Sequence, residues 1–91
     1  MTKSNSNWYV YVVRCSDNTL YTGITTDVTR RLEEHNNDNS LGARYTRHRR
    51  PVSLIYSETY ETRSAASIRE CEIKKMPRTK KELLINNTEE L

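Results

Sequence analysis

The chain has 91 residues, with 15 Lys and Arg against 12 Asp and Glu and a formal net charge of +3. A chain of this length folds as one domain and buries only about 60 to 65% of its unfolded surface. The charge is too small by itself to establish a nucleic-acid partner, so the clustering of basic residues carries more information. No apolar run approaches the roughly 18 residues of a membrane span, which indicates a protein without a membrane partner.

The ends of the chain and its cysteines bear on domain limits and compartment. Residues 1–7 form a polar, flexible tail without the apolar core of a signal peptide, which predicts a cytoplasmic protein. We expect the folded domain over residues 8–87 and a frayed end at 88–91. Cys15 and Cys71 are too far apart for a zinc pattern, and a disulfide is not expected in a reducing compartment, so both are interpreted as packing residues.

An unbroken run of β-branched and aromatic residues extends from Trp8 to Val13. Such a run predicts a strand that is covered on both faces and therefore lies at the centre of a sheet. Residues 16–18 form a turn cluster, and β character resumes over residues 19–22 until Gly23 ends the second strand. The resulting hairpin brings a tyrosine of each strand, Tyr11 and Tyr21, close together.

A helix follows the hairpin and carries two further polar candidates. Thr26 or Asp27 can cap it, and its apolar positions recur four residues apart on one face. Arg31 borders that apolar stripe and His35 shares its face, so the arginine should point toward the hairpin. Taken alone, Arg31 is typical of a surface ion pair and His35 of a helix end.

The densest positive stretch of the chain is residues 42–51. One interpretation is a solvated loop whose charges only repel one another. The other is a phosphate-binding loop, because guanidinium groups match phosphate oxygens and a tyrosine offers a stacking face. Its place beside the tyrosine hairpin favours nucleic-acid binding. The candidate binding residues are Arg44, Tyr45, Arg47, Arg49 and Arg50.

The next stretch predicts a third strand. Residues 52–60 follow Pro51, and Val52, Leu54 and Tyr56 are expected on one face. This strand completes a three-stranded antiparallel sheet flanked by helices, an α/β (α+β) architecture.

Two helices close the chain. A helix over residues 65–76 is capped by Thr62 or Ser64, and Pro77 separates it from a last helix over residues 78–87. Glu70 and Glu72 both border the apolar face of the first of these helices. Helical periodicity does not choose between the two carboxylates.

The spacing of the tyrosines and the arginine matches a known signature. YVY at 9–11 is followed after nine residues by YTG at 21–23, and Arg31 stands ten positions beyond Tyr21. This resembles the GIY-YIG nuclease superfamily. The segments RRLEEHN, GARYTRHRRP, VSLIY and AASIRECEIKK extend the resemblance to about residue 85. The chain resembles small stand-alone bacterial members and, more distantly, the nuclease domain of UvrC.

Three positions depart from the family pattern. Tyr9 stands in place of the first glycine and Thr22 in place of the isoleucine, changes that are frequent in looser members of the superfamily. Ile24 stands three residues after Tyr21, where the UvrC domain has a lysine. One cation near the phosphate is therefore missing.

The resemblance implies a metal-dependent endonuclease that hydrolyses DNA at irregular or branched structures in repair or recombination. It selects Glu70 as the ligand of one Mg²⁺ or Mn²⁺ ion, because the family's glutamate comes four residues after a small residue such as Ala66. We expect a monomer with no small-molecule cofactor. The alternative is a nucleic-acid-binding module on the same fold that cuts poorly or not at all. The catalytic residues implied are Tyr11, Tyr21, Arg31 and His35.

Overall fold

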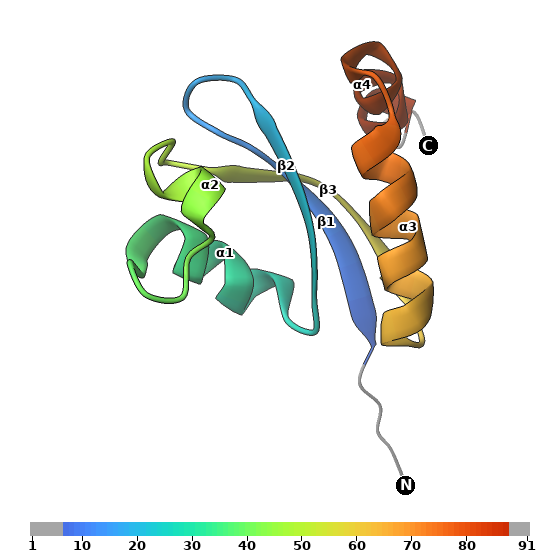
Figure 1. Cartoon of the computed structure of the whole chain (residues 1–91), viewed down its shortest axis with the longest axis horizontal. Helices are drawn as coiled ribbons and strands as arrows, with labels where there is room; N and C mark the ends of the chain where they lie inside the picture. Colours follow the sequence, from blue (N-terminus) through green and yellow to red (C-terminus); the bar gives the residue numbers. More distant parts are fainter. Residues whose placement is uncertain (1–6, 88–91) are drawn as a thin grey trace, which may run out of the picture.

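The computed structural model describes residues 7–87. These residues form one antiparallel sheet with helices on both of its sides (Figure 1). The flexible tail predicted at the N-terminal end and the frayed end predicted at 88–91 fall on residues 1–6 and 88–91, outside the described part of the chain. In order, the elements are β1 (Trp8–Arg14), β2 (Leu20–Thr25), α1 (Val28–Asn37), α2 (Arg44–Arg47), β3 (Ser53–Tyr60), α3 (Arg63–Lys75) and α4 (Arg78–Asn87).

The sheet has the order β2-β1-β3, so the first strand is central, as its sequence predicts. Four consecutive residues of β1, from Val10 to Val13, are at most 2% exposed, which confirms that both faces of this strand are covered. Figure 1 shows why: α1 and α2 lie on one side of the strands and α3 and α4 on the other. The fold class predicted from the sequence is confirmed.

Alternation along β1 divides the interior into two clusters, because successive side chains of a strand point to opposite faces. One cluster lies on the α3 side and contains Val10, Val12, Tyr56, Ala66, Ile73 and Ile85. The other lies toward α1 and contains Tyr11, Val13, Cys15 and Val52, with Tyr21 and Leu32 packed against it. Tyr11 therefore belongs to the face that α1 covers.

The two cap alternatives are resolved by hydrogen bonds. The side chain of Asp27 accepts from the backbone N–H of Arg30 at 3.0 Å, so Asp27 and not Thr26 caps α1. The hydroxyl of Thr62 accepts from the N–H of Ala65 at 3.1 Å and caps α3. Each bond satisfies an N–H group that the first helical turn leaves free.

Several local expectations are wrong. The second strand does not end at Gly23 but continues to Thr25, with Gly23 paired opposite Tyr11. The basic stretch is not entirely loop, because it contains the short helix α2. Cys71 is exposed on α3 and so is not a packing residue, whereas Cys15 is buried.

The third strand also differs from its predicted alternation. Val12 pairs with Tyr56 but Val13 pairs with Leu54, so a β-bulge leaves Ile55 without a partner on β1. An extra residue in one strand reverses which face the following side chains occupy. Tyr56 consequently lies on the α3 side and Val52 on the α1 side, and the expectation that they share a face is wrong.

Within residues 7–87, no helix combines the length and the apolar character needed to cross a membrane.

Candidate active site

The Tyr11 side chain lies across β2 at the position of Gly23. A β-carbon placed on Gly23 would come within 2.6 Å of the Tyr11 hydroxyl oxygen and 2.8 Å of the ring, distances that real side chains do not tolerate. The glycine after the second tyrosine of the motif therefore leaves the space through which the first tyrosine reaches the far side of β2. Sequence spacing alone gives no indication of this contact.

The hydroxyl of Tyr11 meets the imidazole of His35 from α1. The hydroxyl oxygen lies 2.8 Å from His35 Nε2, and the other ring nitrogen, Nδ1, lies 2.9 Å from the hydroxyl of Thr46 in α2. His35 and Thr46 are both fully buried. Tyr21 packs edge-on against the imidazole, with ring centroids 5.4 Å apart. Three residues to which the resemblance gives a catalytic role thus lie together with a threonine to which it gives none.

The environment sets the protonation of this pair. Burial raises the pKa of Tyr11 to about 12, and the hydrogen bond and the charge of Arg31 oppose that rise only in part. Burial also lowers the pKa of His35 to about 4, reinforced by the positive charge of Arg31. At neutral pH the site therefore holds a phenol and an uncharged imidazole.

Arg31 is the positive group of the site. Its positive charge acts on the Tyr11 hydroxyl and opposes the rise in the pKa of that group. The guanidinium donates to Glu34 at 2.7 Å and to the backbone carbonyl of Leu41 at 2.6 Å. These bonds hold it at the border of α1, where the sequence places it. The neighbouring Arg30 pairs with the same Glu34 at 3.5 Å but is more than half exposed.

Glu70 approaches the tyrosine from α3. Its negative charge contributes to the raised pKa of Tyr11, so the carboxylate lies within electrostatic reach of the hydroxyl. The preceding residue, Arg69, pairs with Glu58 of β3 at 2.9 Å and fixes the rotation of α3 about its axis. Lys74, one turn later, lies 3.2 Å from a carboxylate oxygen of Glu70. Glu72, the alternative, is exposed and pairs with Arg69.

The basic segment lies against the same site. Tyr45 stacks on Tyr21, with ring centroids 5.7 Å apart and planes inclined by 21°. The guanidinium of Arg49 lies 4.0 Å from the centre of the Tyr45 ring and pairs with Asp17 at 3.1 Å. The ring of Tyr45, which the sequence suggests as a stacking face for a base, is thus already in contact with the Tyr21 ring and the Arg49 guanidinium.

The four arginines of this segment have different surroundings. Arg50 donates to the carbonyls of His35 at 2.6 Å and Asp38 at 3.0 Å, and so holds the end of α1. Arg44 is exposed. The Nε atom of Arg47 is buried and is the one such side-chain nitrogen or oxygen without a hydrogen-bond partner among the described residues. Arg44 and Arg47 are consequently the arginines available to a ligand.

Comparison with known proteins decides the family. The family model described as the GIY-YIG catalytic domain matches residues 7–82, most of the chain. The chain belongs to the GIY-YIG family. The resemblance stated from the spacing of Tyr11, Tyr21 and Arg31 is confirmed.

Relatives of the GIY-YIG chain include small proteins named UPF0213. The one from Desulfotalea psychrophila is 55% identical over 82 residues, which cover 90% of this chain and 74% of the relative. The one from Haloquadratum walsbyi is 56% identical over 80 residues, 88% of each chain. A solution structure of the UPF0213 protein from Bacillus halodurans is 41% identical, with a TM-score of 0.57 over 88% of this chain and 83% of that one. A solution structure of an E. faecalis protein is 40% identical, with a TM-score of 0.61 over 94% and 91%.

GIY-YIG nucleases generally depend on a divalent metal, and the donor set of this chain fits a hard cation. Mg²⁺ is commonly bound by one or two carboxylates, with water and substrate phosphate completing its octahedron. Glu70 supplies one carboxylate, which is partly buried and pairs with Lys74. Within residues 7–87 no cluster of three or more His, Cys, Asp or Glu side chains could hold an ion without such outside ligands.

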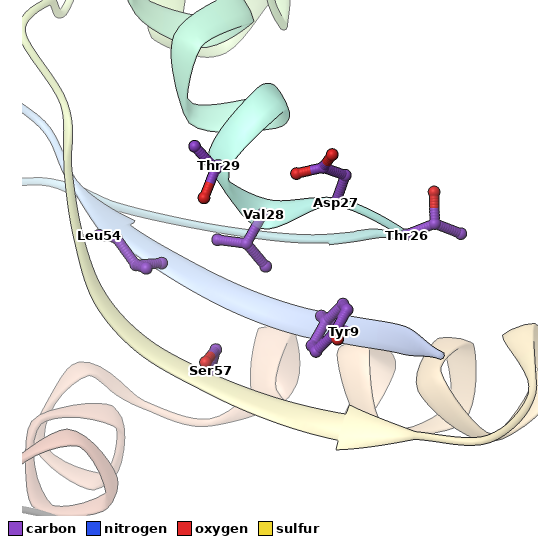
Figure 2. A pocket seen from close by; sticks show the side chains of 7 residues that line it. All are labelled: Tyr9, Thr26, Asp27, Val28, Thr29, Leu54 and Ser57. Carbon is purple, nitrogen blue, oxygen red and sulfur yellow. The ribbon is translucent and has the colours of Figure 1, made fainter. Parts of the chain in front are cut away.

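A separate hollow of about 460 Å³ lies beside the first turn of α1 (Figure 2). None of the residues implied in catalysis lines it. Figure 2 shows its side chains coming from β1, from the start of α1 and from β3. They are Tyr9, Thr26, Asp27, Val28, Thr29, Leu54 and Ser57.

Proposed function

We propose that this protein is a metal-dependent endonuclease that hydrolyses phosphodiester bonds of DNA. One observation carries the proposal: the Tyr11 hydroxyl hydrogen-bonds His35, and the charges of Arg31 and Glu70 both act on the pKa of that hydroxyl. Hydrolysis of a phosphodiester needs a proton acceptor for water, a positive group at the developing charge and a carboxylate for the ion. These four side chains, which come from β1, α1 and α3, supply the three functions.

The protonation of the site favours a relay over a preformed tyrosinate. A water oxygen attacks phosphorus, and the leaving oxygen departs with the electron pair of its bond and takes a proton from solvent. The water proton passes to the Tyr11 oxygen while the Tyr11 proton passes to His35 Nε2, 2.8 Å away. Because the pKa of Tyr11 is raised to about 12, this exchange avoids a free phenolate. Tyr21, against the imidazole, positions the relay, and Arg31 stabilises the charge on the phosphorane.

A bound Mg²⁺ or Mn²⁺ ion would neutralise charge on the phosphate oxygens when it is present at Glu70.

A binding module without turnover is the second candidate, and one observation favours it. Ile24 packs against the apolar cluster on the α3 side, where the UvrC domain has a lysine. The site therefore has one cation fewer than that nuclease, while Tyr11 has a raised pKa rather than the depressed one that a preformed base requires.

A substrate panel separates the two functions. Linear, nicked and branched DNA, single-stranded DNA and RNA would be incubated with Mg²⁺ or Mn²⁺, with binding and strand cleavage measured at equal protein concentration. The described residues form one domain, so we expect selection by shape and fastest cleavage of branched or nicked DNA, as in repair or recombination. Binding of every substrate without metal-dependent cleavage would support the module instead.

Arg31→Ala should lower the cleavage rate by about 10² to 10³, the usual cost of removing a group that stabilises transition-state charge. Extra metal should not restore the rate, because the lost charge acts on the phosphorane. Arg30→Ala is the matched control, since Arg30 pairs with the same Glu34 but is largely exposed. Single-turnover rates that fall equally in both variants would assign Arg31 a merely structural part.

Arg44→Gln combined with Arg47→Gln should weaken DNA binding and flatten its salt dependence. Two lost phosphate contacts change the log-log slope by roughly 1.8 through counterion release. Arg50 is left intact because it holds the end of α1. Lys75→Gln with Lys80→Gln removes the same charge from exposed positions of α3 and α4 and serves as the control. If the dependence of DNA affinity on salt concentration had the same slope in both double variants, a specific role for α2 would be contradicted.

A further inference from the structure

The family resemblance assigns Thr46 no role, yet Thr46 is completely buried beside the candidate relay. Its hydroxyl oxygen lies 2.9 Å from His35 Nδ1 and 3.1 Å from the backbone carbonyl of Ala43. It is 0% exposed, as is His35. A buried hydroxyl with two partners is constrained, because it has one proton to donate and otherwise accepts.

The direction of each bond follows from counting protons. The carbonyl of Ala43 is only an acceptor, so the Thr46 proton goes to it. The Thr46 oxygen then accepts, and His35 must donate from Nδ1. The uncharged ring carries one proton, so Nε2 bears a lone pair and accepts the Tyr11 proton. Each proton in this series of hydrogen bonds, from Tyr11 through His35 and Thr46 to Ala43, then has an acceptor.

The reverse direction leaves a proton unplaced. If Thr46 donated to Nδ1, the proton of His35 would be on Nε2 and would point at the Tyr11 oxygen. Among the described residues, His35 is the one hydrogen-bond acceptor at the Tyr11 hydroxyl. In this arrangement the hydroxyl proton of Tyr11 would therefore be buried without a partner. A buried donor without a partner loses the hydrogen bond that water would have given it, which disfavours this arrangement.

We propose that Thr46 is a positioning residue that fixes His35 as the Nδ1–H tautomer and thereby presents the Nε2 lone pair to Tyr11. The inference rests on the proposed nuclease function and deepens it, since without this tautomer Tyr11 has no acceptor for its proton. Thr46 belongs to the same turn of helix as Arg44 and Arg47. One short helix thus holds the proton acceptor and carries the two arginines that are free to meet phosphate.

The test reads the tautomer directly. Nitrogen-15 NMR of the imidazole rings distinguishes an Nδ1–H from an Nε2–H histidine, and the chain has only two histidines. His48 is exposed and is identified by its absence from the His48→Gln spectrum. We expect the wild type to show His35 as Nδ1–H, and Thr46→Val to lose that tautomer because valine cannot accept the bond. Thr46→Ser should keep it.

Cleavage supplies the second readout. Thr46→Val should cut about 10- to 100-fold more slowly, the cost usual for removing a hydrogen-bond partner that orients a functional histidine, and Thr46→Ser should recover most of the rate. A wild-type His35 protonated on Nε2 would overturn the proposal, and this result needs no folded variant. An unchanged tautomer in folded Thr46→Val would overturn it equally. If the tautomer behaves as expected but no protein cuts, the positioning role stands and the nuclease function fails.

Discussion

Tyr11→Phe should reduce single-turnover cleavage by about 10² to 10⁴, the range typical of a lost proton-transfer group. The substitution removes the hydroxyl that hydrogen-bonds His35 and keeps the ring that crosses Gly23. DNA affinity should be unchanged, because the basic segment is untouched. Folding stability should fall by about 1 to 3 kcal/mol, since His35 Nε2 loses its partner in the interior. Quench-flow or gel-based rates, together with thermal melts, measure both effects.

Tyr9→Phe is the matched control for this substitution. Tyr9 lies two residues earlier on β1, on the same face of the strand, and lines the separate hollow rather than the His35 site. It should cut at the wild-type rate. A Tyr11→Phe protein that cuts as fast as Tyr9→Phe would remove Tyr11 from the chemistry.

Glu70→Gln should lose cleavage in Mg²⁺ or Mn²⁺ to below detection while it retains most DNA binding. The amide keeps the size of the side chain but lacks the charge that attracts a hard cation. Mn²⁺ binding, followed by calorimetry or electron paramagnetic resonance, should weaken in step. Measuring Mn²⁺ binding as well as cleavage shows whether the variant is inactive because it has lost the ion or because α3 is distorted.

Glu72→Gln controls for the other carboxylate of the same helix. Glu72 is exposed and pairs with Arg69, so its loss should leave metal binding and cleavage near wild-type levels. Should Glu72→Gln be the variant that loses the ion, the choice of Glu70 made from the resemblance would be wrong.

Much of the fold could be predicted from local pattern. The unbroken apolar run of β1 implies burial on both faces, and the structure places α1 and α3 on those two faces. The cap of each of these helices could be narrowed to two candidates, because capping depends on residues close in the sequence. The bulge between β1 and β3 could not be predicted, because it arises from pairing between distant segments, and it moved Tyr56 and Val52 to opposite faces.

The site was predictable only in part, for a similar reason. The spacing of Tyr11, Tyr21 and Arg31 identifies the family. Thr46 joins the site through a contact between α1 and α2, and no periodic pattern in the sequence indicates that contact. The one available signal is local, since threonine hydroxyls often bond the carbonyl three residues earlier. The arginine cluster looks uniform in the sequence, whereas contacts at the end of α1 set Arg50 apart.

The most direct test of the central claim is one side-by-side cleavage measurement on branched DNA in Mn²⁺, with protein in excess and binding recorded on the same samples. The claim is that the junction of Tyr11, His35, Arg31 and Glu70 performs the hydrolysis. The account predicts that the wild type cuts, and that Tyr11→Phe and Glu70→Gln bind as well but cut at least about 10²-fold more slowly. Equal cleavage by all three proteins, or binding with no cleavage by the wild type, would contradict it.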